Sequence, residues 1–354
     1  MSGSSLDGLD MAFVHFEENA GQWIFEIQEA YCKPYPLHWK EKLTGINELS
    51  AKEYLLLHTL YGHWLGSAVN DFIEEKNLTY RVQLIASHGH TAFHDPARRM
   101  TAQLGDGAAI AAVTGIRTIT DFRSIDLALG GQGAPIVPIG EKLLFPDYDL
   151  FLNIGGIANL SAKGTNRIGF DVCPANRVLN LLAAGTEKGY DDNGSLAAAG
   201  NVDVNLLGKL NGLNYYNQPY PKSLSNEFGL KEIYPMILHA QLSIHDALAT
   251  YVEHIATQIS KSLNLLKQIF SGKEELSLLI TGGGAHNRFL IDSINNKVSS
   301  EGIKCIIPSD KLVDYKEALI IALMGALRWR EDINVLHTVT GASKDSINGA
   351  VWSN

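Results

Sequence analysis

The chain has 354 residues, 45% of them hydrophobic and 19% charged, with 33 glycines and 3 cysteines. This composition excludes a disordered chain and a coiled coil, and it is typical of a compact α/β enzyme with many tight turns. At roughly 100–200 residues per domain, the length predicts two domains. The formal net charge is −9 and Lys and Arg form no cluster, which argues against non-specific binding to nucleic acid or to anionic membranes.

The cysteines and the first residues indicate the compartment. Cys32, Cys173 and Cys305 are odd in number and far apart, which fits neither a disulfide framework nor a zinc ribbon. The first basic residue is Lys33, so the opening stretch lacks the basic region of a signal peptide. The longest apolar stretch, Ala318–Leu327, is too short to span a bilayer. We therefore expect a cytoplasmic protein.

The N-terminal part predicts a hairpin, a long helix and a buried strand. The β-like runs Ala12–Phe16 and Trp23–Ile27 predict the hairpin. The helix begins at about Ser50, which has capping-box spacing to Glu53 and is followed by apolar residues at steps of three and four. Val82–Ala86 is a continuous apolar run and predicts a buried strand.

The rest of the chain predicts further strands that run into glycine turns, and two further helices. In chain order these elements are the strand and turn Phe151–Gly156, the strand Ile168–Asp171, the amphipathic helix Ser243–Phe270 with Ser243 near its cap, the strand Leu278–Thr281 followed by Gly282–Gly284, and the helix Lys316–Arg330.

Three glycine turns replace the common nucleotide-binding signatures. The chain has neither a P-loop motif nor a G-x-G-x-x-G that opens a helix after a strand. Gly3–Gly8 places two hydroxyls and a carboxylate among free backbone N–H groups, which suits a phosphate and its Mg²⁺. Gly155-Gly156 and Gly282–Gly284 would allow close approach of a ligand, but each turn alone has an ordinary structural explanation. Three such turns in two domains are better explained by a nucleotide in the cleft between them.

Polar residues follow the strand Val82–Ala86, at the end where α/β folds bind ligands. His88, His90 and His94 lack a convincing carboxylate or thiolate partner for a metal, so polar contacts with a substrate are the preferred interpretation. Cys173 has no paired histidine in the sequence, and we expect a buried thiol rather than a nucleophile.

Asp171 allows two interpretations. At the end of a strand, its carboxylate could orient and deprotonate an attacking hydroxyl or water. It could equally be the N-cap of a helix that starts near Pro174, because Asp is a good cap and Pro suits the first turn. Position in the sequence does not separate the two.

Taken together and in order, these motifs resemble the anhydro-N-acetylmuramic acid kinases, a branch of the actin/hexokinase/acetate-kinase superfamily. The most specific stretch is DFRSIDLALGGQGAP at residues 121–135. The other matching stretches cover the chain from end to end and are Met1–Asp10, Ser87–Thr91, Gln103–Asp106, Asn153–Asn159, Gly169–Asn176, Tyr190–Gly200, Pro221–Ser223, Gly282–Asn287, Glu317-Ala318 and Thr340–Ala342.

The resemblance implies an α/β fold of two domains, the actin-like ATPase (ribonuclease H-like) fold, with an interdomain ATP cleft. We expect residues 1–132 in the N-terminal domain, to which residues 338–354 return, and residues 133–337 in the C-terminal domain. The implied reaction uses ATP and Mg²⁺ to open the 1,6-anhydro bridge of anhydro-N-acetylmuramic acid with water while O6 is phosphorylated. The products are N-acetylmuramic acid 6-phosphate and ADP, in cell-wall recycling. Family members are often dimers, and we expect a homodimer.

The resemblance also implies roles for single residues. Asp171 would be the general base for the attacking water, and Asp7 would lie near the metal. The ATP phosphates would be bound by Gly3, Ser4, Ser5, Leu6, Asp7, Gly8, Leu9 and Asp10. The nucleotide site would be completed by Gly155, Gly156, Gly283 and Gly284. The candidates for sugar contacts are His88, Asp121, Arg123, Gln132 and Glu317.

The chain departs from the family pattern at five places. Ser4 stands where Thr is usual, and His90 where Gln is usual. Val172-Cys173 replaces a small residue and Gly, which would narrow the approach of a ligand to the backbone. Leu224-Ser225 replaces Thr-Gly. Met1 lies inside the phosphate motif, whereas the family has a strand before it, so we expect the natural start upstream or residues omitted from the numbering.

Three alternative functions remain open at this point. The drifted substrate loops allow a kinase for another 1,6-anhydro sugar such as levoglucosan. Actin-like folds also allow a non-catalytic, nucleotide-dependent binding module, although such a module does not need Asp171 as a base. A metal hydrolase built on His88, His90 and His94 is the least favoured.

Overall fold

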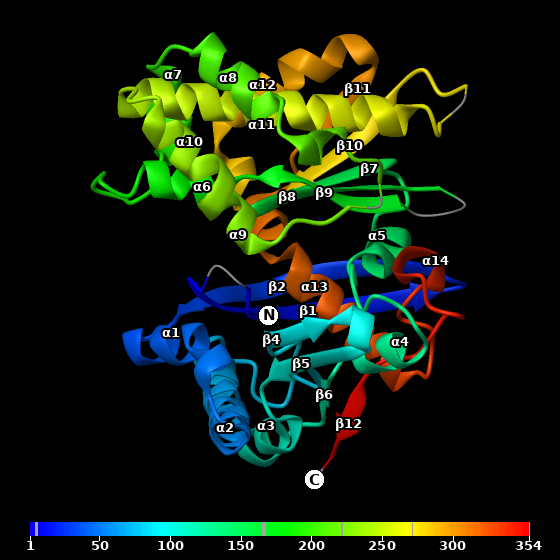
Figure 1. Ribbon diagram of the computed structural model, residues 1–354. Helices are drawn as coiled ribbons and strands as arrows, with labels where there is room; N and C mark the ends of the chain where they lie inside the picture. Colours follow the sequence, from blue (N-terminus) through cyan, green and yellow to red (C-terminus); the bar gives the residue numbers. More distant parts are fainter. Residues whose placement is uncertain (4–5, 165–167, 221, 271, 354) are drawn as a thin grey trace. The chain divides into compact units, whose positions relative to one another are not determined.

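The computed structural model describes residues 1–3, 6–164, 168–220, 222–270 and 272–353, with only the backbone of residue 226 (Figure 1). The chain forms two compact units. Unit 1 comprises Met1–Phe145 and Tyr315–Asn354, and unit 2 comprises Pro146–Asp314. Each unit combines strands and helices, which confirms the α/β class. Among the described residues, no helix is both long and apolar enough to cross a membrane.

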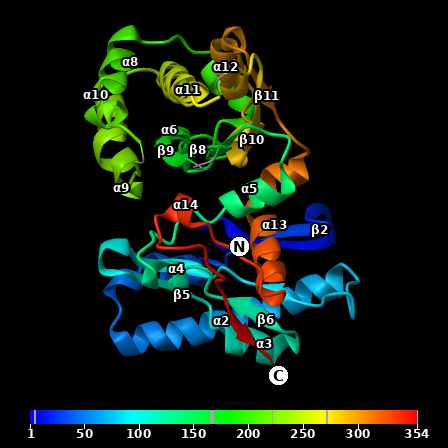
Figure 2. The same cartoon turned by 90° about the vertical axis from the view of Figure 1, so that its right-hand side faces the viewer.

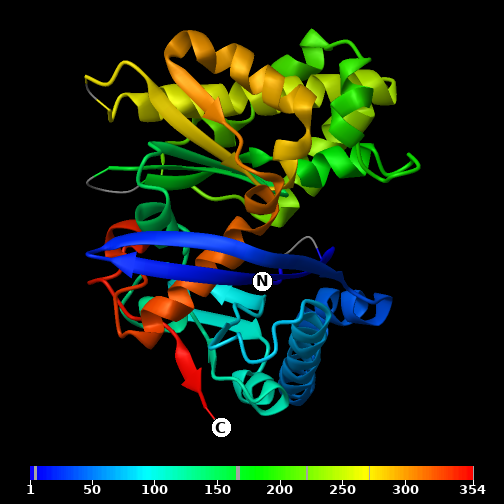
Figure 3. The ribbon, with the colours of Figure 1, turned by 180° about the vertical axis from the view of Figure 1, so that it is seen from behind.

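The described residues of unit 1 form three sheets. The predicted hairpin is confirmed and is longer than expected: β1 (Gly8–Asn19) pairs antiparallel with β2 (Gln22–Pro34), and Figure 3 shows it as a long twisted ribbon. The other strands of this unit are β3 (Ile85–Ala86), β4 (His90–Asp95), β5 (Met100–Leu104), β6 (Thr118–Thr120) and β12 (Ala350–Trp352). The sheet orders are β12-β6-β3 and β4-β5.

The long helix of unit 1 starts where its capping signal places it. The predicted helix after Ser50 is α2 (Ala51–Glu75), and Ser50 and Glu53 form the capping box. The predicted strand Val82–Ala86 pairs over β3 alone. The other helices of the unit are α1 (Leu37–Thr44), α3 (Gly107–Thr114), α4 (Ser124–Ala128), α5 (Pro138–Leu144), α13 (Asp310–Trp329) and α14 (His337–Thr340), with the start of α13 in unit 2.

The limits of unit 1 differ from the boundaries at 132 and 337 that the sequence suggested, because α5 packs against α13. A buried ion pair joins Lys316 to Glu141 at 3.0 Å. A Cβ on Gly140 would overlap Ile320, so glycine permits the close approach of the two helices. These contacts bring the segment up to Phe145, and the chain from Tyr315 onward, into unit 1.

The C-terminal segment completes unit 1. Strand β12 pairs antiparallel with β6, and Trp352 donates from Nε1 to Oγ1 of Thr120 at 2.9 Å. The hydroxyl of Thr340 donates to Oδ1 of the fully buried Asp126 at 2.6 Å. The other oxygen of Asp126 accepts from the N–H of Gly133 at 2.7 Å. Through Asp126, Thr340 of the C-terminal segment therefore stabilises the turn around residues 130–135.

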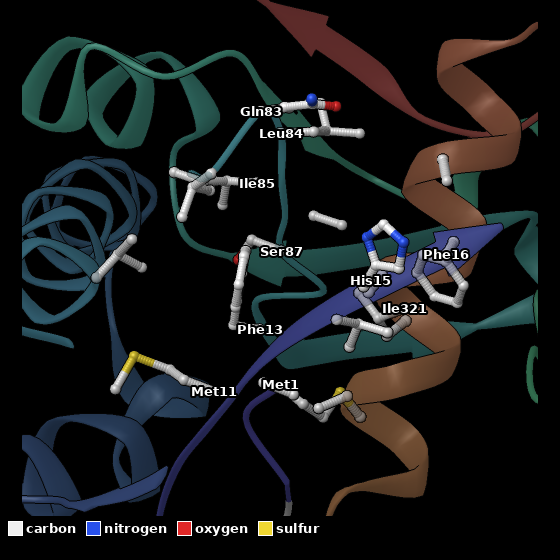
Figure 4. Close-up of a pocket in the computed structure, with 18 of the residues that line it drawn as sticks. Met1, Met11, Phe13, His15, Phe16, Gln83, Leu84, Ile85, Ser87 and Ile321 are labelled. Atoms are coloured by element: carbon white, nitrogen blue, oxygen red, sulfur yellow. The ribbon is translucent and has the colours of Figure 1, made fainter. Parts of the chain in front are cut away.

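A pocket of about 660 Å³ separates β1 from β3 inside unit 1 (Figure 4). Met11 and Phe13 line it from β1, Ile85 from β3, and Ile321 from α13. Of the predicted site residues, Leu9 and Asp10 line this pocket.

Unit 2 is built on one five-stranded sheet of order β11-β10-β7-β8-β9. Its strands are β7 (Leu150–Ile154), β8 (Ile157–Ala162), β9 (Ile168–Pro174), β10 (Leu276–Thr281) and β11 (Ile303–Ile306). The predicted strands at 151, 168 and 278 are thus confirmed. Strand β10 lies parallel to β7 and β11, whereas β7, β8 and β9 are antiparallel neighbours.

Helices cover the sheet of unit 2. The longest is α11 (Ile244–Lys267), whose N-cap Ser243 accepts from the N–H of Asp246, as the sequence predicted. Figure 2 shows α11 and α12 on the same side of this sheet. The other helices are α6 (Asn176–Leu182), α7 (Ser195–Ala198), α8 (Val204–Asn211), α9 (Asn226–Phe228), α10 (Tyr234–His239) and α12 (Arg288–Val298).

Candidate active site

Within the N-terminal motif, Leu6 and Asp7 lead directly into β1. Gly3 and Leu6–Asp10 are described, whereas the predicted contacts Ser4 and Ser5 lie outside the described residues. Leu6 adopts a left-handed φ of 55°. The N–H of Gly8 donates to Oδ1 of Asp7 at 3.0 Å, and the Asp7 side chain is exposed. An exposed carboxylate suits Mg²⁺, which binds one or two carboxylates together with water and phosphate oxygens.

Gly8 and Leu9 have structural roles of their own in this motif. A Cβ on Gly8 would overlap Sγ of Cys32 and lie 2.9 Å from the carbonyl oxygen of Lys33, so glycine is required for the pairing of β1 with β2. Leu9 is buried in the core of unit 1. Asp10 is half-buried, and its N–H donates to the carbonyl of Met1 at 2.9 Å. Asp7 therefore presents the most accessible side chain among residues 6–10.

Two glycine turns of unit 2 meet at the end of β7. A Cβ on Gly282, which has φ +83°, would lie 2.5 Å from Oδ1 of Asn153, and one on Gly284 would overlap the side chain of Ile154. The fold therefore requires glycine at both positions. The exposed Gly283 is different, because a Cβ there would make only an ordinary contact of 3.6 Å with Nδ2 of Asn176.

Gly155 and Gly156 also have room for a side chain. The nearest atom to a Cβ on Gly155 would be the carbonyl oxygen of Ile157 at 3.6 Å, and a Cβ on Gly156 would lie 3.8 Å from Arg177. Neither residue has a left-handed φ. Since packing does not demand glycine at these two positions or at Gly283, the open backbone there is suited to close contact with a ligand.

Two side chains beside these turns, Asn176 and Arg177, were not among the predicted site residues. Asn176 donates from Nδ2 to the carbonyl oxygen of Ile154 at 3.2 Å, and its N–H donates to the carbonyl oxygen of Gly155 at 3.1 Å. Asn176 thereby ties the start of α6 to the first glycine turn. Both residues follow the stretch around Asp171, and their contact with the turn depends on tertiary structure.

Asp171 lies within β9, three residues before its end, and not at the end of a strand as predicted. Helix α6 has Ala175 as its N-cap residue, so Asp171 does not cap it. Its Oδ2 accepts from the N–H of Leu224 at 2.9 Å, and its carbonyl oxygen accepts from the hydroxyl of Tyr215 at 2.7 Å. Burial raises the pKa of the Asp171 carboxyl, and the hydrogen bond from Leu224 opposes this shift.

The loop after Lys222 holds Asp171 from one side. The N–H of Asp171 donates to the carbonyl oxygen of Lys222 at 3.1 Å. Nζ of Lys222 lies 4.6 Å from the centre of the Tyr215 ring and donates to the carbonyl oxygen of Tyr215 at 3.3 Å. Tyr215 and Leu224 also line a second pocket, of about 480 Å³. Lys222 belongs to a motif that the sequence shows, but its contact with Asp171 appears only in the structure.

His88 and Arg123 form a second polar cluster, in unit 1. Arg123 donates from Nε to Nε2 of His88 at 2.9 Å and from Nη1 to the carbonyl oxygen of Gly133 at 2.7 Å. Nδ1 of His88 lies 2.9 Å from the carbonyl oxygen of Gly89. Burial and then the charge of Arg123 hold the pKa of His88 well below its usual value. Burial lowers the pKa of Arg123 to about 10.

Asp121, which precedes Arg123 closely in the sequence, has a strained backbone conformation. It has a left-handed φ of 58°, which is uncommon for a residue other than glycine and concentrates at functional sites. Its Oδ1 accepts from both the N–H and the hydroxyl of Ser124, at 3.1 and 2.7 Å. Gln132 has an exposed side chain, and its N–H donates to the carbonyl oxygen of Thr340. Glu317 is exposed on α13.

The three histidines do not converge. Nδ1 of His90 lies 3.1 Å from the hydroxyl of Ser2, and Nδ1 of His94 lies 3.1 Å from that of Thr101. His88 receives the Arg123 hydrogen bond at the nitrogen that a metal would need. Within the described part of the chain, no three His, Cys, Asp or Glu side chains gather to hold a metal ion.

Residues 1–354 match the family model described as anhydro-N-acetylmuramic acid kinase. The chain belongs to this family. It is 34% identical over 364 residues to the anhydro-N-acetylmuramic acid kinase of Sulfurovum sp. (strain NBC37-1), which covers 99% of this chain and 97% of the relative. It is 32% identical over 366 residues to that of Vibrio vulnificus (strain CMCP6), which covers 100% of this chain and 97% of the relative. The family assignment also identifies the chain as a kinase.

Similarity to solved structures is weaker. The activator of the 2-hydroxyisocaproyl-CoA dehydratase from Clostridium difficile with bound ADPNP is 17% identical, with a TM-score of 0.38, over 66% of this chain and 86% of that chain. Xylulose kinase from Rhodospirillum rubrum is 15% identical, with a TM-score of 0.33, over 71% of this chain and 51% of that chain.

The structure bears on two departures from the family pattern. Val172 and Cys173 are both buried in the core of unit 2, so neither side chain projects into solvent. Cys173 is a buried free thiol, as predicted, and burial raises the pKa of this thiol above its usual value. Leu224 keeps the backbone N–H that binds Asp171, and this contact does not depend on the side chain that replaces Thr.

Proposed function

We propose that the chain uses ATP and water to convert 1,6-anhydro-N-acetylmuramic acid into N-acetylmuramic acid 6-phosphate and ADP. The observation that carries the proposal is Asp171, a carboxylate in a chain of this kinase family that is held at both its side chain and its backbone. Such a rigid carboxylate with a raised pKa is suited to act as a general base near neutral pH.

In the proposed reaction, the oxygen of water attacks the anomeric carbon and Asp171 takes its proton. The bond between the anomeric carbon and O6 breaks, and O6 takes the γ-phosphoryl group as the bond to ADP breaks. Because O6 departs as an alkoxide-like oxygen, it needs no base of its own. A single carboxylate is therefore sufficient for the protein's proton transfer.

The phosphates of ATP would be bound mainly by backbone N–H groups. The open backbone at Gly155, Gly156 and Gly283 supports contact with the nucleotide in unit 2. Phosphoryl transfer depends on positioning and on neutralisation of charge, which backbone dipoles supply without raising the net charge of the protein. Mg²⁺, for which the exposed Asp7 is the proposed protein ligand, would neutralise part of the phosphate charge.

Arg123 favours anhydro-N-acetylmuramic acid over levoglucosan as the substrate. Its guanidinium is oriented by His88 and by Gly133, and a fixed guanidinium binds carboxylates well. Muramic acid carries a carboxylate and levoglucosan does not. Asp121, Gln132 and Glu317 are the further proposed contacts with the sugar hydroxyl and amide groups.

The decisive experiment is a coupled assay of ADP release with anhydro-N-acetylmuramic acid, levoglucosan and their non-anhydro sugars. We expect release with the first sugar only. Release with levoglucosan alone would transfer the proposal to that sugar, and no sugar-dependent release would favour a binding module. In ¹⁸O-water, label should enter the anomeric hydroxyl; label in the phosphate would indicate plain hydrolysis of ATP.

A further inference from the structure

Arg177 lies beside the open glycine turn, and the described residues give its side chain no counter-charge. It is the second residue of α6, and its side chain is half-buried. Its Nε lies 3.8 Å from the position that a Cβ on Gly156 would take. Arg177 and Gly156 are also joined by a backbone hydrogen bond of 3.4 Å. The guanidinium group therefore lies alongside the exposed backbone of Gly156.

Several other cations of unit 2 form ion pairs, in contrast to Arg177. Lys273 binds Asp149 at 2.6 Å and Lys297 binds Glu253 at 2.5 Å. For the Arg177 side chain, no ion pair or hydrogen bond is found among the described residues. Burial alone lowers its pKa. A partly buried charge that lacks a protein partner is unfavourable, so this position is better explained by an anion that binds there.

The surroundings indicate which anion fits. Gly155, Gly156 and Gly283 leave the backbone open, and Asn176 links the first of them to the start of α6. Arginine presents a planar fork of donors that matches phosphate oxygens in pairs. A lone arginine in a chain of net charge −9 does not make a surface for nucleic acid. A small phosphate-bearing ligand is the remaining class.

We propose that Arg177 binds the phosphate groups of the nucleotide and so supplies the side-chain cation of the nucleotide site in unit 2. This inference rests on the proposed function, because it assumes that the nucleotide occupies the glycine turns. It adds a residue that the family motifs did not single out.

The test compares Arg177→Met and Arg177→Lys with the wild-type chain by isothermal titration calorimetry. The ligands are ADP, adenosine and inorganic pyrophosphate, in the presence of Mg²⁺. The matched control is Lys209→Met, which removes one positive charge from an exposed position of unit 2 on α8. Circular dichroism and the melting temperature establish that each variant is folded.

We expect Arg177→Met to weaken ADP binding about tenfold or more, the usual order for a lost charge-assisted hydrogen bond. Adenosine binding should stay within twofold, and Lys209→Met should bind like the wild type. The ADP affinity of Arg177→Lys should lie between those of the wild type and Arg177→Met, since lysine keeps the positive charge but loses the planar pair of donors.

Equal ADP affinity in wild type and Arg177→Met would overturn the inference while leaving the proposed function intact. An equal loss for ADP and adenosine would also overturn it, because the arginine would then act on the nucleoside. The wild type could bind pyrophosphate through Arg177 and yet bind ADP no more tightly than pyrophosphate. In that case Arg177 forms an anion site, and the proposal that the nucleotide binds there fails. If the wild type binds neither ADP nor pyrophosphate, the inference about Arg177 and the proposed function both fail.

Discussion

The backbone N–H of Leu224 donates a hydrogen bond to Oδ2 of Asp171, 2.9 Å away. The two residues lie far apart in the chain, and the contact fixes the carboxylate that β9 presents. The bond stabilises the charged form and lowers the pKa, whereas burial raises it. The proposed base is therefore balanced between two opposing effects, and each can be changed separately.

Replacing the base itself is the first test. Asp171→Asn keeps the shape of the side chain and an oxygen for Leu224, but it cannot accept the proton from water. We expect kcat to fall by about 10²–10⁴, while calorimetry shows ADP affinity within twofold of the wild type. More than a tenth of the activity remaining would contradict the general-base role.

Removing the hydrogen-bond donor is the second test. Leu224→Pro deletes the N–H, so the pKa of Asp171 should rise, and the acidic limb of the kcat profile should move by about one to two units toward higher pH. Leu224→Ala changes the side chain but keeps the donor, and its profile should match that of the wild type. Identical limbs in both variants would show that this bond does not set the pKa.

The third test separates two neighbouring glycines. Gly283→Ala has room in the fold and should change the free energy of unfolding by less than about 0.5 kcal/mol, yet its methyl group should weaken binding of ATP. Gly284→Ala would overlap Ile154 and should cost about 1–3 kcal/mol in stability. Urea unfolding and calorimetry measure both. Unchanged ATP affinity in Gly283→Ala would place the nucleotide elsewhere.

The fourth test concerns acid sensitivity. His254 is fully buried, with Nδ1 on Asn211 and Nε2 on Tyr216, and burial lowers its pKa to about 3. Between its unfolded pKa of about 6.5 and this value, only the unfolded chain binds the proton, so stability falls as pH falls. This residue should cost about 2 kcal/mol between pH 7 and pH 5.

Urea unfolding at the two pH values measures that loss. His254→Gln should remove this part of the pH dependence. His239→Gln, at an exposed position on α10, is the control and should behave like the wild type. The same slope in His254→Gln as in the wild type would show that other groups determine the acid response.

The fifth test fills the pocket between β1 and β3. Ala322 lines this pocket, and Ala322→Leu should bury additional apolar surface there and stabilise unit 1 by about 1 kcal/mol. Ala256→Leu is the contrast, because Ala256 is fully buried in α11 and overpacking should destabilise by about 1–3 kcal/mol. A lower melting temperature for Ala322→Leu would show that the pocket cannot accept the side chain.

What the sequence predicted well is local. Ser50 and Ser243 were found as helix starts because a cap and the residue it binds lie three positions apart. The extent of β9 beyond Asp171 was missed because polar and apolar residues alternate poorly there, with Val172 and Cys173 both buried. The predicted strand at Val82–Ala86 was shortened because pairing depends on the neighbouring strand.

In the candidate site, too, single residues were predicted from the sequence, whereas their contacts were not. Family motifs selected Asp171, His88 and Arg123 one by one, but the contact between His88 and Arg123 joins segments that only the fold brings together. The three glycines at 282–284 look alike in the sequence, and packing against Ile154 separates them. Arg177 carries no local signal, since its significance lies in the absence of a nearby carboxylate in the described structure.

The return of the C-terminal segment to unit 1 has a consequence for the order of folding. Unit 2 is one continuous stretch of chain, so it can fold as soon as it leaves the ribosome. Unit 1 begins earlier but is completed later, since β6 lacks its partner β12 and Asp126 lacks Thr340 until residues 340–352 are made. During synthesis, the first unit to start is therefore the last to finish.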